Sequence, residues 1–453
     1  MTFLDGAVDM VRSFESRAIV GTVDAVRGLT VLVRRFRVPI GSVVRIGGDD
    51  PRRDGVLGEV VGFDETRAIV MLLGGATGTS PGDRVHLERV SDSMMVGDAL
   101  LGRVVDGLGS PIDGGPPPSG LTPRPLFPPN LNPMARGMIS EPLGTGLRVL
   151  DGLLTIGKGQ RIGIFSGAGV GKSTLLSGIA RGTSADVNVI ALVGERGREV
   201  KEFIVDALGG EGLARSVVVV ATGDESPLLR VRAMAAAITA AEHFRDRGLD
   251  VMLMVDSVTR FAQAQRQIGL AAGEQPATKG YTPSVFSLLP QLLERAGGIE
   301  GGGSITGIYT VLVEGDDLNE PVADAARGIL DGHVVLDRRL ASRGHFPAIQ
   351  PLDSISRVAD QVSEPNHEVA RRRVIELLAA YRESEELINI GAYAAGSNPM
   401  TDVAIALRPR LDAFLRQGRD DRSSFPDTCR ALYEIAAESE RLRQAAATGA
   451  VAS

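Results

Sequence analysis

A glycine-rich stretch, Ser166–Thr174, follows the apolar run Arg161–Phe165 and precedes two leucines at helical spacing. It reads Ser-Gly-Ala-Gly-Val-Gly-Lys-Ser-Thr, the pattern of a phosphate-binding loop with Ser166 where glycine is usual. The order predicts a strand, a loop and a helix, with backbone N–H groups and the helix N-terminus directed at phosphate oxygens. A turn that binds nothing is the alternative, but few unrelated turns match at so many positions.

The residue types inside this stretch predict which ligand it holds. Lys172 supplies a compact positive charge for phosphate oxygens, and the Ser173 hydroxyl is placed to ligate Mg²⁺. We therefore expect ATP or ADP with Mg²⁺ as the cofactors. The residues expected to contact the nucleotide are Ser166, Gly167, Ala168, Gly169, Val170, Gly171, Lys172, Ser173 and Thr174.

Bulk composition bounds the class of protein. The chain has 453 residues, a formal net charge of −7 and an ordinary apolar fraction of 43%, which suits a multidomain globular protein. An acidic balance argues against a dedicated nucleic-acid binder. One cysteine, Cys429, forms no internal disulfide, and neither a signal peptide nor a membrane-spanning apolar run is evident. We expect a cytoplasmic protein that meets the membrane only through partners.

The chain begins with two different kinds of pattern. Residues 1–17 carry apolar side chains at helical spacing, which predicts an amphipathic helix that packs on its own domain or docks on a partner. Residues 18–90 carry short Val/Ile/Leu runs separated by turn clusters, which predicts a small β-barrel. Only Phe36 and Phe63 are aromatic there, so a structural or oligomer-forming role is favoured over binding of single-stranded nucleic acid.

Two further domains follow. Residues 91–364 contain a proline-rich segment and then alternate strands with helices, which predicts a mostly parallel sheet covered by helices and built around the phosphate loop. The expected strands are Val187–Val193, Ser216–Ala221, Val251–Val255, Ser304–Leu312 and His333–Val335, and the expected helices include Val200–Leu208 and Leu228–Phe244. Residues 365–453 carry apolar side chains at three- and four-residue spacing and predict a helical domain. The fold class is α/β.

Charged residues at strand ends are the candidates for chemistry beyond the loop. Asp256 ends the apolar strand Val251–Val255, where a carboxylate holds a water of the Mg²⁺ shell or merely caps the next turn. Glu195 follows another apolar strand and either activates the attacking water or belongs to a surface charge cluster. Arg357 can act as an arginine finger, which reaches from a neighbouring subunit and neutralises the charge on the transferring phosphate. Many other arginines of the chain have the same chemistry.

These residues lie within a set of motifs that resembles a known family. From about Val96 to Gln417 the chain is similar to the catalytic-subunit superfamily of rotary ATP synthases, and most of all to the ATPases of flagellar type III export. The motifs that carry the resemblance are Gly102–Gly109, Ile156–Gln160, Gly194–Glu199, Asp256–Arg260, Pro276–Ser284, Glu314–Asp317, Asp331–His333 and Pro347–Arg357. The resemblance implies a RecA-like core that hydrolyses ATP.

The resemblance also assigns roles to single residues. It implies that Lys172 binds the β- and γ-phosphates, Ser173 ligates Mg²⁺ and Glu195 is the catalytic carboxylate. Arg196 and Arg260 are expected on the γ-phosphate side. The same resemblance makes Asp256 the acid at the end of its strand and Arg357 the arginine finger donated across a subunit interface. It also places Phe346 and Phe414 on the two faces of the adenine, with core packing as the alternative for both rings.

The resemblance implies partners as well. It predicts a homohexamer, a stator-like regulator at the helix of residues 1–17, a coiled-coil stalk protein, a membrane export gate and chaperone–substrate complexes. The segment Asn389–Asn398 lacks the acidic lever loop of synthase β-subunits. This favours a flagellar export ATPase over a synthase β-subunit. A virulence type III secretion ATPase shares nearly every other motif and remains open. A hexameric RNA translocase is a further alternative, which the acidic balance disfavours.

Overall fold

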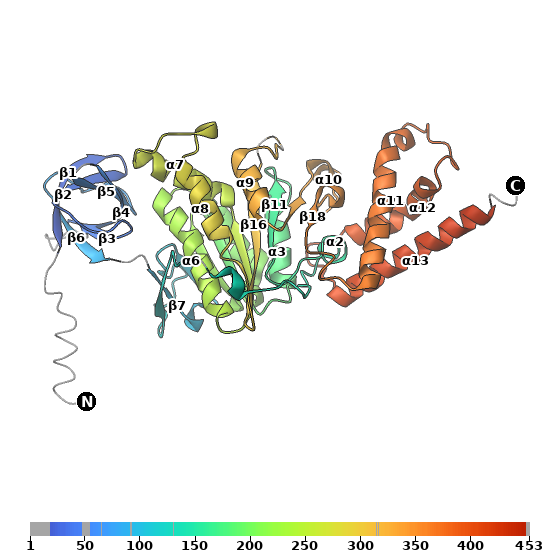
Figure 1. Ribbon diagram of the computed structural model, residues 1–453, viewed down its shortest axis with the longest axis horizontal. Helices are drawn as coiled ribbons and strands as arrows, with labels where there is room; N and C mark the ends of the chain where they lie inside the picture. The colour runs from blue at the N-terminus through green and yellow to red at the C-terminus, as the bar shows by residue number, and fades with distance from the viewer. Residues whose placement is uncertain are drawn as a thin grey trace, which may run out of the picture.

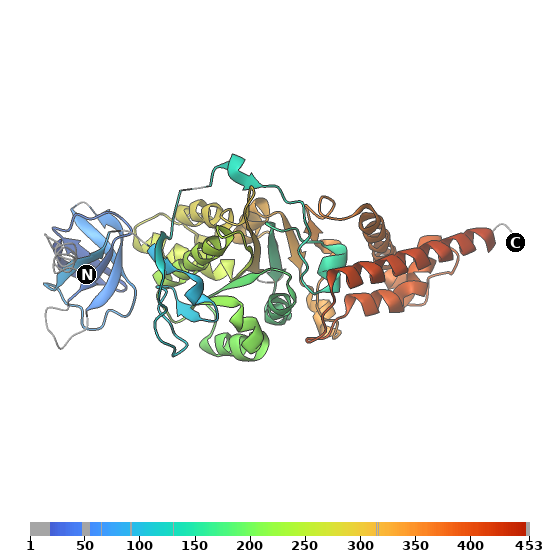
Figure 2. The same ribbon diagram turned by 90° about the horizontal axis from the view of Figure 1, so that it is seen from below.

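The computed structural model describes residues 19–47, 55–64, 66–90, 93–129, 131–313, 315 and 317–449. The chain forms an elongated row of three parts: a barrel at one end, an α/β core in the middle and a helical domain at the other end (Figures 1 and 2). The expected amphipathic helix of residues 1–17 lies outside the described residues. The predicted fold class is confirmed.

The N-terminal part is a closed β-barrel. Its strands pair in the order β1-β2-β5-β4-β3-β6. They are β1 (Val20–Arg27), β2 (Thr30–Arg34), β3 (Val43–Ile46), β4 (Val56–Asp64), β5 (Arg67–Leu72) and β6 (Arg84–Arg89). The short apolar runs predicted the first five. Strand β6 was missed because it alternates single apolar residues with charged ones and contains no apolar run.

The barrel is joined to the core by packing and by one buried ion pair. Val43, Met71 and Leu73 of the barrel belong to the same apolar cluster as the core sheet. Arg232 Nη1 donates a hydrogen bond of 2.9 Å to Glu59 Oε2 of β4. Their side chains are only 2% and 12% exposed, so this contact fixes the barrel against helix α6 (Pro227–Arg245).

The core is a mixed, mostly parallel sheet. Its main path runs β18-β17-β11-β16-β14-β12-β13-β8. The parallel strands are β8 (Val104–Asp106), β11 (Arg161–Ser166), β12 (Val187–Val193), β13 (Ser216–Ala221), β14 (Asp250–Asp256), β16 (Ser304–Leu312) and β17 (Gly332–Val335), with β18 (Ile355–Ser356) antiparallel at the edge. The small strands β10 (Arg136–Gly137) and β15 (Gly297–Ile299) pair beside β16. The expected core strands are confirmed.

Helices cover both faces of this sheet, which is why its strands read as continuous apolar runs. Alternate residues of β12 face opposite sides: Val189 and Ala191 join one apolar cluster, and Ile190 and Leu192 join the other. The first face is covered by α6, α7 (Val258–Ala271), α8 (Pro283–Leu293) and α9 (Pro321–Ile329). The second face carries α2 (Arg148–Leu153) and α3 (Lys172–Gly182).

The helix expected over Val200–Leu208 is broken into several pieces. The structure has α4 (Gly197–Glu202), a π-helical turn η3 (Phe203–Leu208) and α5 (Gly209–Ala214). Gly209, with φ of 69°, adopts the left-handed conformation that glycine allows and ends the π-helical turn. The helical pattern was therefore correct, and Gly209 determines where the π-helical turn ends, whereas the change at Phe203 occurs at no glycine.

The C-terminal part consists of long helices that pack on the second face of the core through α2. These helices are α11 (Pro365–Asn389), α12 (Pro399–Leu415) and α13 (Phe425–Gly449). The predicted helical domain is confirmed, and α11 continues well past its last buried leucine through a charged, solvent-exposed segment. Among the helices of the described segments, none has both the length and the hydropathy that crossing a bilayer requires.

Candidate nucleotide-binding and catalytic site

The glycine-rich loop lies between β11 and α3, at the carboxyl edge of the parallel strands. Gly169 and Gly171 have φ of 77° and 92°, a conformation that side chains disfavour. Gly171 is the N-cap of α3, and no side chain caps the first turn. The N–H groups of that turn are therefore open to an anion, as binding of a phosphate requires.

Lys172 lies at the centre of the site, between two carboxylates. Its Nζ is 2.5 Å from Asp256 Oδ1 at the end of β14 and 3.2 Å from Glu195 Oε1, just beyond β12. Strands β12 and β14 are neighbours, with Leu192 opposite Asp256, so the sheet register brings both acids to the lysine. Thr310 Oγ1 of β16 donates a hydrogen bond of 2.8 Å to Asp256 Oδ1 and holds that carboxylate in place.

Burial and charge both tune these groups. Burial opposes the charge on Lys172, but the carboxylates of Asp256 and Glu195 outweigh it and raise the pKa of Lys172. Burial raises the pKa of the Glu195 carboxyl; the Lys172 ammonium opposes that shift, whereas Asp256 and a hydrogen bond with Glu199 add to it. Glu195 thus combines proximity to the phosphate loop with raised basicity, which is the property of a general base.

Arg260 packs against Gly194, the residue before Glu195, because a glycine leaves room for it. A Cβ on Gly194 would fall 2.8 Å from Arg260 Cβ and 3.1 Å from its Cγ, so only glycine lets this residue of α7 pass so close. The buried Nε of Arg260 has no hydrogen-bond partner within the described part of the chain. An arginine with an unpaired guanidinium donor, packed against Gly194, has the chemistry to bind a γ-phosphate oxygen.

The structure does not bring the Arg196 side chain, expected on the γ-phosphate side, to Lys172. Its side chain is 81% exposed, and its Nη1 donates to Glu199 Oε1 at 3.2 Å instead of approaching Lys172. Arg196 has an extended backbone as the N-cap of α4, and neighbours along an extended backbone point in opposite directions. Because Glu195 points inward, Arg196 points outward.

Arg357 lies far from its own phosphate loop. It follows β18 at the outer edge of the sheet, exposed, with its backbone N–H donating to the Asp331 carbonyl at 3.0 Å. Strand β18 runs antiparallel to β17 and ends near Gly332, where β17 begins. Arg357 is therefore at the amino end of the parallel strands, whereas the phosphate loop is at their carboxyl end. The structure leaves it free for contact with another chain.

A cavity of about 480 Å³ opens beside the phosphate loop, where a nucleoside would continue from the phosphates. It is lined by Leu147, Gly171, Thr174, Leu175, Gly178, Gly344, Phe346, Pro347, Arg416, Gln417, Gly418 and Arg419. Phe346 is 44% exposed and its ring lies over Gly171, where an added Cβ would meet it at 3.4 Å. We call this cavity the base pocket.

The sequence analysis expected Phe414 on the second face of the adenine, but the structure does not bring this residue to the base pocket. Phe414 is 4% exposed, belongs to the apolar cluster between core and C-terminal domain, and would contact a Cβ on Gly152 at 2.7 Å. The apolar register of α12 directs it inward. Residues 416–419, just past the end of α12, line the base pocket instead, and only the proximity of Phe414 to Gly418 in the sequence pointed to them.

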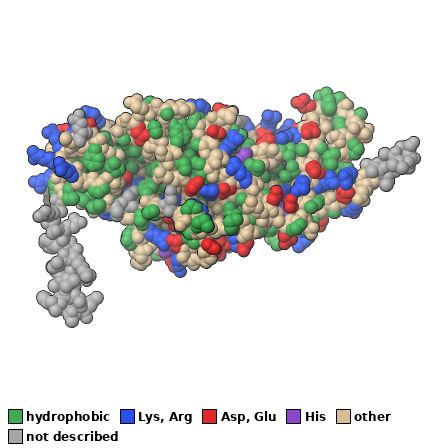
Figure 3. Space-filling view, in the orientation of Figure 1, with side chains coloured by type: hydrophobic (Ala, Val, Ile, Leu, Met, Phe, Trp, Pro, Cys, Tyr) green, Lys and Arg blue, Asp and Glu red, His purple; other side chains and the backbone are tan. Residues whose placement is uncertain are grey.

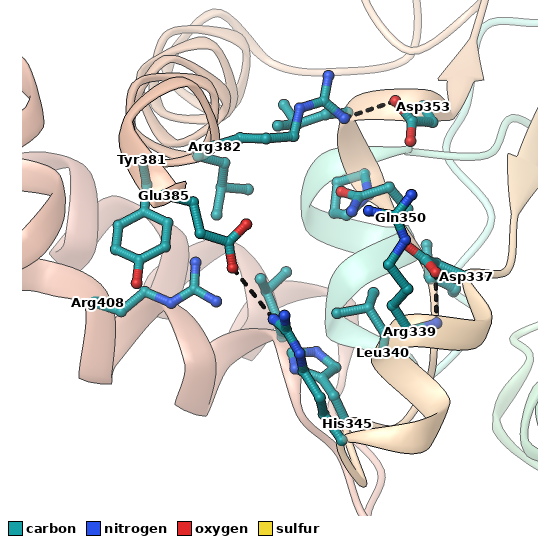
Figure 4. A pocket seen from close by; sticks show the side chains of 16 residues that line it. Asp337, Arg339, Leu340, His345, Gln350, Asp353, Tyr381, Arg382, Glu385 and Arg408 are labelled. Atoms are coloured by element: carbon teal, nitrogen blue, oxygen red, sulfur yellow. Dashed lines mark hydrogen bonds and ion pairs between the residues drawn. The ribbon is translucent and has the colours of Figure 1, made fainter. Parts of the chain in front are cut away.

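A second cavity lies between α10 (Arg338–Ser342) and the helices α11 and α12 (Figure 4). Ion pairs cross it from the core to α11: Arg343–Glu385 at 3.2 Å and Arg382–Asp353 at 2.7 Å. None of the loop residues 166–174 lines it. This cavity of about 260 Å³ is therefore not part of the phosphate site.

The site suits magnesium only together with a nucleotide. Within the described segments, no group of three or more His, Cys, Asp or Glu side chains forms a metal cage. Ser173 is exposed in the first turn of α3, and Asp256 is nearby through Lys172. Mg²⁺ keeps several waters and binds through few protein oxygens plus substrate phosphates, which is the set available here.

Comparison with known proteins shows the family of this chain. Residues 146–356 match the family model of the ATP synthase alpha/beta family, nucleotide-binding domain, and residues 363–434 match the T3SS EscN ATPase C-terminal domain. The Flagellum-specific ATP synthase of Bacillus subtilis is 50% identical over 433 residues, 96% of this chain and 99% of that protein. The Type 3 secretion system ATPase of Xanthomonas euvesicatoria is 48% identical over 92% of this chain and 93% of its own length.

A solved structure extends the similarity to three dimensions. The assembled ATPase EscN from the type III secretion system of enteropathogenic E. coli, in complex with its central stalk EscO, is 42% identical. It superposes with a TM-score of 0.85 over 92% of this chain and 100% of that chain. This chain belongs to the family of flagellum-specific ATP synthases and type III secretion ATPases, within the ATP synthase alpha/beta family.

Proposed function

We propose that this chain is the ATPase of a flagellar type III export apparatus and that it works as a homohexamer. The observation that carries the proposal is the Lys172 ammonium held between Glu195 and Asp256 beside an open phosphate loop, with Arg357 on the opposite edge of the sheet. A site of this kind hydrolyses ATP when a neighbouring subunit supplies the missing arginine.

The chain's own residues divide the work. Backbone N–H groups of the loop and the Lys172 ammonium bind the phosphates, and Ser173 contributes an oxygen to Mg²⁺, which neutralises developing charge on the phosphates when bound. Glu195 orients the attacking water and accepts its proton at a carboxylate oxygen. Arg260 stabilises charge on the γ-phosphate from the chain's own side, and Arg357 of the adjacent subunit does so from the other.

The solved relative supports an assembled ATPase with a stalk partner, and the further partners are our proposal. EscN has been described as an assembled ATPase with a central stalk, EscO. We infer a hexamer with a coiled-coil stalk protein in its centre, a stator-like regulator at residues 1–17, and contacts with the membrane export gate and with chaperone–substrate complexes. The protein is then cytoplasmic and reaches the inner membrane through these partners, where hydrolysis releases export substrates from their chaperones.

The surface supports a protein partner over a nucleic acid. On the face shown in Figure 3, basic and acidic side chains are interspersed over the core and the C-terminal helices, and basic side chains gather only at the barrel end, without a stripe that continues onto the core. A nucleic-acid motor of this size gathers Lys and Arg along its binding path. The formal net charge of −7 points the same way. We therefore propose no nucleic-acid partner.

A virulence type III secretion ATPase is the second candidate. Relatives of both kinds match at similar identity, 50% for the Bacillus subtilis protein and 48% for the Xanthomonas euvesicatoria protein, and the C-terminal helices match the EscN domain model. Deleting the gene separates the two candidates. Loss of flagella and motility supports the flagellar role, and loss of effector secretion with normal motility supports the other.

Assembly makes a first prediction about activity. Because each site needs Arg357 from a neighbour, the ATPase rate per chain will rise with protein concentration and level off once oligomers are complete. Light scattering on the same samples will show mass and activity rising together. An ATPase rate per chain that is constant from dilute monomer to assembled protein would contradict the shared site.

A second prediction concerns pH. Glu195 acts as a base only when deprotonated, and burial raises its pKa above the ordinary value of 4.5. As pH falls, kcat/KM will therefore begin to decline at a higher pH than an ordinary glutamate would cause, because kcat/KM reports groups of the free enzyme. The measurement is a kcat/KM profile from about pH 5 to 9. The residual kcat/KM of Glu195→Gln will not show this decline at low pH. A decline that persists in that variant would refute the assignment of Glu195 as the base.

A further inference from the structure

We propose that Arg416 forms the second face of the base pocket, opposite the Phe346 ring, and that His345 is the positioning residue that holds it there. The proposal rests on the proposed function, since it concerns the adenine of the bound nucleotide. It assigns to an arginine the place that the sequence analysis had given to Phe414.

The two sides of the base pocket come from different domains and are tied together by the backbone. Gly344–Pro347 belongs to the core, and Arg416–Arg419 follows α12. The Gln417 N–H donates to the Phe346 carbonyl at 2.8 Å, so the turn after α12 is fixed against the segment that carries the phenylalanine. Phe346 and Arg416 both line the cavity between these segments.

The side chain of Gln417 does not face the base as a recognition group, because its polar atoms are engaged. Its Nε2 donates to the Gly146 carbonyl at 2.7 Å and to the Asp421 carbonyl at 3.0 Å. Its Oε1 accepts from the Arg148 N–H at 2.9 Å. At 6% exposure, Gln417 fixes the turn and leaves its neighbour Arg416 to contact the ligand.

His345 anchors the Arg416 side chain at the edge of the base pocket. Arg416 Nε donates to His345 Nδ1 at 3.3 Å, and His345 is only 5% exposed, with its backbone N–H donating to the Leu340 carbonyl at 2.9 Å. The opposite side of the imidazole faces the second cavity, where Arg408 stacks on Tyr381 (Figure 4). Burial, with Arg416 and Arg408, lowers the pKa of His345, with Asp412 opposing, so Nδ1 stays an acceptor.

A guanidinium fixed in this way matches a purine base. It is planar, stacks on aromatic faces and adds a cation–π attraction to the ring. Arg419, which also lines the base pocket, donates to the Asp206 carbonyl at 3.1 Å and is drawn toward η3. Phe346 on one face and Arg416 on the other leave the phosphates free to reach the loop beyond Gly171.

The test compares ligands with and without a base on the full chain. Arg416→Ala will raise the Kd for ADP with Mg²⁺, measured by calorimetry, and the KM for ATP by about 5- to 150-fold, the range for loss of one base-stacking contact. Its kcat at saturating ATP will stay near that of the parent chain. Its affinity for inorganic tripolyphosphate will not change, because that ligand has no base. Arg416→Lys will recover only part of the lost ADP affinity, because lysine lacks the planar guanidinium that stacks on the base.

The role of His345 is tested separately. His345→Asn keeps an acceptor oxygen near the place of Nδ1 and will retain ADP affinity, whereas His345→Leu will lose much of what Arg416→Ala loses. Arg408→Ala, on the far side of the imidazole, is the matched control and will leave ADP affinity unchanged. Equal loss in the Asn and Leu variants would overturn the role of His345.

The outcomes for Arg416 separate this proposal from the proposed function. Unchanged ADP affinity in Arg416→Ala, or an equal loss of tripolyphosphate affinity, would overturn the stacking role while the parent chain still hydrolyses ATP. A parent chain that hydrolyses no ATP at any concentration would overturn the proposed function itself.

Discussion

Replacing Glu195 by glutamine will lower kcat for ATP hydrolysis by about 10²- to 10⁴-fold and leave nucleotide binding intact. The glutamine has nearly the shape of the glutamate and still accepts a hydrogen bond from Lys172, 3.2 Å away in the parent chain. It takes no proton from water, however. The phosphates are bound by loop N–H groups and Lys172, which this change leaves in place.

Binding and turnover are therefore measured on the same preparation. Calorimetry with ADP and Mg²⁺ will give a Kd equal to that of the parent chain or lower, because one negative charge near the phosphates has been removed. Single-turnover hydrolysis will show the loss in the chemical step. Glu202→Gln is the control: Glu202 lies on α4, its side chain is 52% exposed, and it pairs with Arg198 at 3.6 Å. Loss of ADP binding in Glu195→Gln would mean that the residue is misassigned.

Replacing Arg357 by alanine will abolish most ATP turnover, because Arg357 completes the site of the neighbouring subunit. An arginine finger contributes about 10³- to 10⁵-fold to the rate of phosphoryl transfer, so a loss within that range is expected. ADP binding and oligomer mass will be retained, because Arg357 is exposed and lies at the opposite end of the strands from its own phosphate loop. Arg357→Lys will recover little, because the ammonium lacks the planar fork.

Mixing two inactive variants tests the origin of the arginine directly. Lys172→Ala has no working phosphate site but an intact Arg357, and Arg357→Ala has the reverse. In mixed rings, about one quarter of interfaces join an intact site to an intact arginine, so activity will return to about that fraction of the parent rate if sites act independently. If Arg357 served its own chain, every site in the mixture would lack one residue and no activity would return.

Local patterns in the sequence predicted the chemistry and most of the framework. The strand, loop and helix around Lys172 were readable because each residue type there has a local reason: glycines for left-handed backbone, lysine for charge, apolar runs for buried strands. Strand-end acids such as Asp256 were also readable, since the carboxyl ends of parallel strands share one edge. The barrel strand Arg84–Arg89 was not, because its charged residues hid the apolar ones.

Directions of side chains were not readable from the same patterns. Glu195 and Arg196 are adjacent in the sequence, yet one points at Lys172 and the other into solvent, because an extended backbone alternates its side chains. Phe414 and Arg416 are two residues apart, yet one is in the core and the other lines the base pocket, because α12 ends between them.

The sequence alone thus predicted that a nucleoside triphosphate binds at Ser166–Thr174 and that a carboxylate and an arginine complete the reaction. Only the tertiary structure decided that Glu195 and Asp256 meet on one lysine, that Arg260 passes beside Gly194, and that Arg357 faces away from its own site. The physical reason is that covalent order fixes the type and spacing of residues, whereas sheet register and helix ends fix their distances.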